Sequence, residues 1–108
     1  GALAMAADSR PITITLAGRP VTARILPDTI VAYLKRKCWS GPTHPPSAPA
    51  LRFWCWADGR QFNVYVPLPT HKTPRRLMRA AFLEIADYED RHPLDVLADI
   101  QAEEQSKP

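Results

Sequence analysis

Two pairs of short segments alternate between apolar and polar residues with a period of two, the pattern of half-buried β-strands. The first pair covers residues 11–16 and 21–25. With Gly18 and Arg19 at the turn, apolar residues face apolar residues and polar residues face polar ones. The apolar cross-strand neighbours would be Leu16–Val21, Ile14–Ala23 and Ile12–Ile25. The pattern predicts an antiparallel β-hairpin in this register.

The second pair covers residues 51–56 and 61–66, and Asp58-Gly59 between them is a strong signal for a two-residue turn. This turn sets the cross-strand neighbours on both faces. The inward, apolar pairs would be Cys55–Phe62, Phe53–Val64 and Leu51–Val66. The outward pairs would be Trp56–Gln61, Trp54–Asn63 and Arg52–Tyr65. We therefore expect a second hairpin that buries its apolar face.

Helical spacing follows each hairpin. A first helix begins near Pro27, with Asp28 or Thr29 near the cap, and its apolar face carries Ile30, Val31, Leu34 and Cys38. A second helix has Thr73 as N-cap and Pro74 at its first position, and it ends at His92-Pro93. Its buried stripe would be Leu77, Met78, Ala81, Phe82, Ile85 and Tyr88. A short last helix from about Leu94 would bury Val96 or Leu97 together with Ile100.

Residues 39–49 contain Gly41 and four prolines, which predicts a stiff connecting loop. The fold class is therefore α+β: two antiparallel β-hairpins, each followed by a helix, in the order ββαββα plus a short C-terminal helix. We expect a single two-layer domain over residues 11–100. Residues 1–10 are interpreted as a cloning remnant and a disordered N-terminus, and residues 101–108 as an acidic flexible tail.

Length and composition suit one small domain: 108 residues with 45% hydrophobic content provide a single core. No apolar stretch approaches the roughly 20 residues that cross a bilayer, and no segment has the pattern of a secretion signal. We therefore expect a cytoplasmic protein without a membrane partner.

The net charge of +3 hides a polarised distribution. Residues 1–79 hold 12 of the 14 Lys and Arg residues and three of the 11 acids, and residues 80–108 hold the remaining two cations and eight acids. A basic body suits a polyanionic partner or an acidic protein. The alternative is a solvated surface that is merely lopsided.

The residues that could carry chemistry do not form a recognisable catalytic or metal site. Cys38, His44, Cys55, His71 and His92 lack the paired spacing of structural zinc ligands. Both cysteines are expected to be buried thiols, and a Cys38–Cys55 disulfide is disfavoured in a cytoplasmic chain. Acids are sparse in the body, and there is no glycine-rich phosphate loop. We expect no enzymatic activity, no cofactor and no metal.

Two groups of residues are candidates for binding a partner. The outward face of the second hairpin brings aromatic rings beside arginines, as in base-stacking platforms and protein hot spots. The basic run around residue 75 stands at a helix start, where cations oppose the helix dipole while acids occupy the other end. The candidates are Arg52, Trp54, Trp56, Arg60 and Tyr65, joined by Asn63, and Lys72, Arg75, Arg76 and Arg79.

Each group has a structural alternative. The last helix could lie over the aromatic rings through Leu94, Leu97 and Ile100 and form a second small core, or the face could join two copies in a homodimer. The basic helix start could be a solvated face.

The leading functional hypothesis is a small cytoplasmic regulatory or accessory protein, bacterial in type, whose basic body binds DNA or RNA. The alternative is a protein-binding module, an inhibitor or adaptor of a larger complex, that uses the Trp54/Trp56/Tyr65 face. The expected ββαββα order differs from the βαββαβ order of the common RNA-binding sheet platform.

Overall fold

The computed structural model describes residues 12–16, 18–23, 25–46, 48–68 and 75–105. Its elements are β1 (Ile12–Leu16), β2 (Arg19–Ala23), α2 (Pro27–Arg36), β3 (Ser40–Thr43), β4 (Ala50–Ala57), β5 (Arg60–Pro67), α3 (Arg75–Glu89) and α4 (Pro93–Gln105). The α+β class and the ββαββα order with a C-terminal helix are confirmed. Within the described ranges, no helix is both long and apolar enough to cross a bilayer.

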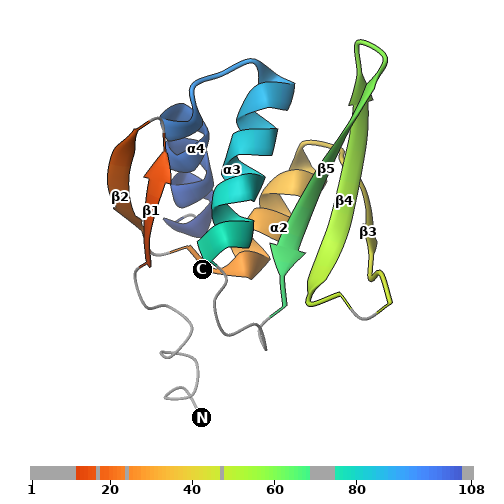
Figure 1. Cartoon of the computed structure of the whole chain (residues 1–108), viewed down its shortest axis with the longest axis horizontal. Coiled ribbons are helices and arrows are strands. Elements are labelled where there is room, and N and C mark those ends of the chain that lie inside the picture. Colours follow the sequence, from red (N-terminus) through yellow and green to blue (C-terminus); the bar gives the residue numbers. More distant parts are fainter. Residues whose placement is uncertain (1–11, 17, 24, 47, 69–74, 106–108) are drawn as a thin grey trace.

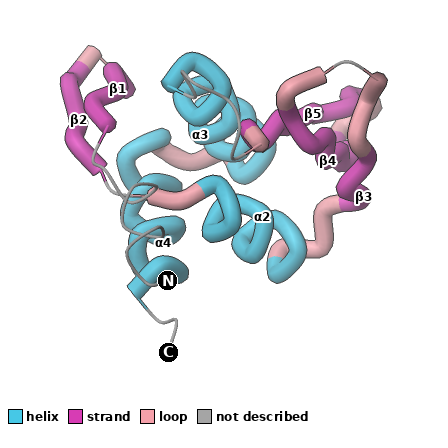
Figure 2. The backbone as a smooth tube through the Cα atoms, turned by 90° about the horizontal axis from the view of Figure 1, so that it is seen from below, coloured by secondary structure: helices cyan, strands magenta, loops and turns pink. Residues whose placement is uncertain are grey.

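The helices lie between two antiparallel sheets. The two-stranded β1–β2 sheet flanks one side of α3, and the three-stranded sheet, in the order β3–β4–β5, flanks the other (Figure 1). Seen from below, α2 and α4 complete the helical layer beside α3 (Figure 2). Each hairpin therefore covers its own side of one helical layer.

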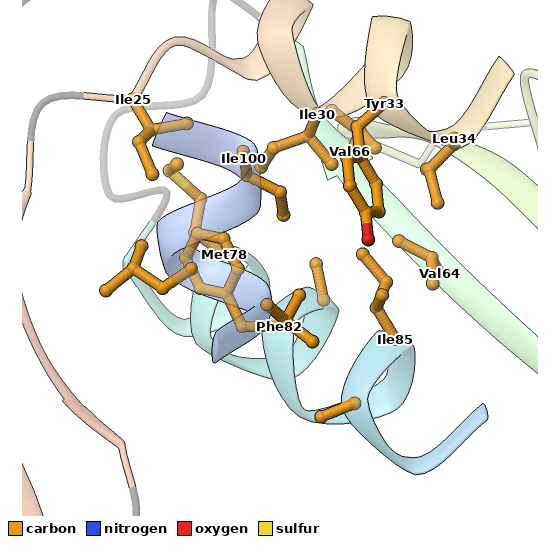
Figure 3. Close-up of a cluster of buried hydrophobic side chains, with 14 of the residues drawn as sticks. Ile25, Ile30, Tyr33, Leu34, Val64, Val66, Met78, Phe82, Ile85 and Ile100 are labelled. Atoms are coloured by element: carbon orange, nitrogen blue, oxygen red, sulfur yellow. The ribbon is translucent and has the colours of Figure 1, made fainter. Parts of the chain in front are cut away.

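The core forms where the helices meet the inner face of the three-stranded sheet. Figure 3 shows side chains from α2, α3, α4 and β5 converging, among them Ile30, Tyr33, Leu34, Val64, Val66, Phe82, Ile85 and Ile100. The stripe predicted for α3 is largely correct, since Met78, Ala81, Phe82 and Ile85 are buried and Leu77 and Tyr88 are half-buried.

The register of the second hairpin is confirmed at every predicted pair. The turn residues Asp58 and Gly59 have φ angles of 52° and 74°, as the favoured two-residue hairpin turn requires. Phe53, Phe62 and Val64 are buried on the inner face, and the polar and aromatic residues between them point outward.

The predicted register of the first hairpin is wrong by two residues. The strands pair Ile14 with Val21 and Leu16 with Arg19, so the turn lies one position earlier than expected. The reason is Pro20, which has no N–H. The predicted turn would have put Pro20 in the hydrogen-bonded pair that closes it, whereas the observed register pairs Pro20 with Thr15 at a non-hydrogen-bonded position. Because the shift is even, the inward residues stay inward.

The N-cap of α2 is Leu26, and Asp28, which was predicted near the cap, lies in the first turn. Two further predictions need correction. The loop over residues 39–49 contains the short edge strand β3, where a proline is tolerated. Helix α4 continues to Gln105, into the segment predicted as a flexible tail, and Arg36 binds Glu103 there at 2.7 Å. Residues 1–10 and the Thr73-Pro74 helix start lie outside the described residues.

Cys38 is exposed, not buried, because α2 ends before it. The Trp39 N–H donates to the Leu34 carbonyl at 3.0 Å and the Cys38 N–H to the Lys35 carbonyl at 3.1 Å, a pattern that closes the helix in a Schellman motif. Cys38 occupies the left-handed position of this motif, with φ of 65°, which normally belongs to glycine. The buried face of α2 also includes Tyr33, which the predicted apolar face did not contain.

Replacing Cys38 with glycine is expected to stabilise the protein by roughly 0.5–1 kcal/mol, because glycine avoids the left-handed strain and the exposed thiol contributes little packing. The matched control is Asp90→Gly, since Asp90 holds the same position after α3 with φ of 55°. Aspartate tolerates this conformation better, so its gain should be smaller. Urea denaturation measures both; a destabilised C38G protein would contradict the interpretation.

Candidate functional site

Three cross-strand pairs of β4 and β5 form one outward surface, Arg52–Tyr65, Trp54–Asn63 and Trp56–Gln61, which we call the outer sheet face. The helices pack on the opposite side of the sheet (Figure 1). Helix α4 packs against α2 and α3 and directs Leu97 and Ile100 into the core. The alternative that α4 covers the aromatic rings is therefore wrong.

The three aromatic residues of the outer sheet face differ in exposure. Trp56 is 64% exposed and Tyr65 is 41% exposed, and these are the exposed large hydrophobic side chains among the described residues. Trp54 is half-buried. Trp56 and Tyr65 are therefore the rings of this face that a ligand can reach from solvent.

Arg52 is held in a defined orientation on this face. Its Nε and Nη2 atoms both donate to Asn63 Oδ1, at 3.0 and 2.8 Å, and its guanidinium lies 4.7 Å from the centre of the Trp54 ring. The Nη1 group has no hydrogen-bond partner among the described residues. Arg52 is thus a pre-oriented cation with donor capacity left for a ligand.

Strand β3 supports Trp54 from the side. Gly41 has φ of 107°, and a Cβ atom at this position would lie 2.7 Å from the Arg52 carbonyl oxygen and 3.1 Å from Trp54 Cζ3. Only glycine permits so close an approach of β3 to β4. Sequence reasoning missed this role of Gly41, although a glycine followed by proline in a connecting segment is a signal of a special backbone position.

Arg60 does not belong to the outer sheet face. It shares the inward side of β5 with Phe62, and its guanidinium lies 4.1 Å from that ring. Its Nη1 binds Asp87 at 2.6 Å and its Nη2 lies 3.6 Å from Glu84. The hydrogen bond to Asp87 raises the pKa of Arg60 above its ordinary value. Strand alternation could have shown this placement, since residues 60 and 62 have the same parity.

At the basic start of α3, Arg79 has an intramolecular partner, whereas Arg75 and Arg76 do not have an ion pair within the described ranges. Lys72 lies outside the described residues. Arg79 Nε donates to the Thr15 carbonyl at 2.6 Å, so Arg79 ties α3 to β1. Arg75 and Arg76 are exposed, and neither has an ion pair within the described ranges. Because α3 packs on the inner side of the three-stranded sheet, these two arginines lie on a different surface from the outer sheet face.

The acids near the end of α3 have structural partners that explain their unfavourable position in the helix dipole. Glu84 accepts the Asn63 N–H at 3.0 Å and thereby caps the free edge of β5. Glu89 accepts the Tyr33 hydroxyl at 2.8 Å, and Arg91 bridges Glu89 and Asp99 at 2.9 and 2.7 Å. Intramolecular pairs thus occupy many carboxylates, while exposed cations such as Lys35, Arg75 and Arg76 stay open to solvent.

The described part of the chain contains neither a cluster of metal-binding side chains nor a disulfide. No three His, Cys, Asp or Glu side chains there lie close enough together to hold a metal ion. Cys38 and Cys55 are both free, and Cys55 is half-buried at the edge of the core.

Comparison with protein-family models, with curated proteins and with solved structures finds no match to this chain.

Proposed function

We propose that this protein is a small non-enzymatic regulatory or accessory protein that binds nucleic acid, with the outer sheet face as its main contact surface. One observation carries the proposal: two exposed rings share a sheet face with a pre-oriented Arg52, and the six residues of that face include no acid. Stacking rings beside a cation suit bases joined by phosphates. The two free thiols suit a reducing, cytoplasmic location.

The start of α3 would add phosphate contacts from a second surface. Arg75 and Arg76 are the open cations there, whereas Arg79 has a structural bond to Thr15. A strand or duplex that extends past the edge of the sheet would meet them through electrostatic attraction, which acts over about 8–10 Å in physiological salt.

The double substitution Arg75→Ala/Arg76→Ala is expected to weaken binding to many sequences alike. Each arginine–phosphate pair that is removed should flatten the log–log salt dependence by about 0.7–0.9. Stability should hold or rise slightly, because cations leave the wrong end of a helix dipole and alanine favours helix. Arg79→Ala is the contrasting variant, since it should lower stability by removing the bond to Thr15.

A mobility-shift assay with DNA and RNA at two salt concentrations tests the proposal, beside a sizing column run on the protein alone. Absence of binding to any nucleic acid at about 0.15 M salt would overturn it. The second candidate, a protein-binding module, would then take its place, because exposed Trp, Tyr and Arg residues are also the preferred anchors of protein interfaces. A dimer on the column that Trp56→Ala dissolves would identify a second copy as the occupant.

A further inference from the structure

We infer that the outer sheet face binds single-stranded nucleic acid, with Trp56 and Tyr65 as the two base-stacking residues and Arg52 as a phosphate contact between them. This inference rests on the proposed function and specifies its ligand. It comes from the relative positions of the exposed rings and from the different environment of Trp54.

The three aromatic residues do not have equal access to a ligand. Arg52 lies over the Trp54 ring at 4.7 Å, and β3 approaches the same ring closely enough that even a Cβ atom at Gly41 would stand 3.1 Å from it. Trp54 therefore acts as a support that fixes Arg52. Trp56 and Tyr65, at 64% and 41% exposure, are the rings that a planar group can reach.

These two rings stand at opposite corners of the outer sheet face. Trp56 lies opposite Gln61, and Tyr65 is four positions further along the same strand as Gln61. At about 3.3 Å per residue along a strand and about 4.8 Å between strands, their backbone positions are roughly 14 Å apart. The Arg52 side chain reaches across to Asn63, in the row between the two rings.

Such a spacing does not fit a double helix. Neighbouring bases of a duplex strand are about 3.4 Å apart along the axis, and their faces are covered by one another. Two bases that stack on side chains whose backbone positions are roughly 14 Å apart are not neighbours in a continuous stack, so they must be separated along the strand and turned outward. A single strand lying across the sheet meets this requirement and places an intervening phosphate near Arg52.

The absence of acids from the face supports this occupant over a basic peptide. None of the six residues is acidic, and the carboxylate of Glu84, which binds the β5 backbone, is directed to the free edge of the strand and to Arg60. The positive charge of Arg52 would repel a basic peptide, and no acid on the face would offset that repulsion. A polyanion, in contrast, complements the charge of Arg52.

The test is a titration of tryptophan fluorescence with a single-stranded oligonucleotide of about 16 nucleotides, compared with a duplex of the same sequence. We expect tighter binding of the single strand and quenching of the Trp56 emission. Trp56→Ala should weaken single-strand binding by roughly 5- to 150-fold, and Tyr65→Ala by a similar factor. Neither should change the salt slope, because stacking involves no charge. Arg52→Ala should flatten that slope by about 0.7.

Matched variants separate stacking from mere disturbance of the sheet. Trp56→Phe and Tyr65→Phe keep a ring and should retain most of the affinity, whereas Gln61→Ala, on the same face without a ring, should have little effect. Unchanged melting temperatures show that each variant is folded, and Tyr65→Ala tests the inference independently if Trp56→Ala does not fold.

The outcomes distinguish this inference from the broader proposal. If duplex binds as tightly as single strand, and the Trp56 and Tyr65 variants bind normally, the single-strand inference is wrong. Binding that then depends on Arg75 and Arg76 would still support a nucleic-acid-binding protein. If neither nucleic acid binds, both proposals fail together.

Discussion

Replacing Phe53 with alanine is expected to lower the free energy of unfolding by about 3–5 kcal/mol, whereas Trp56→Ala should change it by about 1 kcal/mol or less. Both residues belong to β4 and stand three positions apart, so they point to opposite faces of the sheet. Phe53 is fully buried in the core, and its removal leaves a cavity. Trp56 is 64% exposed, and its removal leaves none.

Urea denaturation at neutral pH measures both variants. A loss of 3–5 kcal/mol is a large fraction of the roughly 5–15 kcal/mol that stabilises a domain, so the Phe53→Ala protein should be partly unfolded at 37 °C. A comparable loss for Trp56→Ala would mean that the outer sheet face is covered in solution. That result would also remove the basis for assigning Trp56 to ligand binding.

The second hairpin could be predicted from sequence because neighbouring residues alone determine its turn and its strand pairing. The alternation of residues in β4 and β5 and the Asp58-Gly59 turn determine both register and faces without reference to the rest of the chain. In the first hairpin the faces were predictable for the same reason. Its register was not obtained from apolar matching alone, because the missing N–H of Pro20 decides between registers two residues apart.

Helix ends were predicted less well than helix faces. Apolar spacing placed Met78, Phe82 and Ile85 correctly, since these residues only need to share one side of α3. The same spacing extended α2 to Cys38, because periodicity carries no information on where the Schellman motif stops the helix. The edge strand β3 was missed for a related reason: its pairing depends on the close approach that Gly41 allows.

The candidate site shows how far charge patterns can be interpreted from sequence. The sequence pattern grouped Arg60 with the aromatic face, but in the folded protein Arg60 contacts Glu84 and Asp87 across 24 and 27 positions. Such long-range partners cannot be assigned without a fold. Arg52, Trp54 and Asn63 were grouped correctly because cross-strand neighbours follow directly from the hairpin register.

Tyr33→Phe is expected to lower the free energy of unfolding at pH 7 by about 1.5–3 kcal/mol, the usual contribution of a hydrogen bond to a charged group. The Tyr33 side chain is fully buried, and its hydroxyl donates to Glu89 Oε2 at 2.8 Å. The substitution leaves that carboxylate oxygen without its tyrosine donor, although Arg91 still contacts the other oxygen. Tyr65→Phe is the control, since Tyr65 is exposed and should tolerate the change.

The same substitution should remove part of the alkaline instability of the protein. Burial, reinforced by the hydrogen bond to Glu89 and by its negative charge, raises the pKa of Tyr33 above its ordinary value of about 10. The folded protein therefore keeps the Tyr33 proton at pH values where the unfolded chain loses it. The resulting stabilisation is fully present below pH about 10 and declines as the pH rises above that value. Denaturation curves measured between pH 8 and 11 give the free energy of unfolding of the unsubstituted protein and of Tyr33→Phe. The difference between the two should shrink as the pH rises, and a constant difference across this range would contradict the assignment.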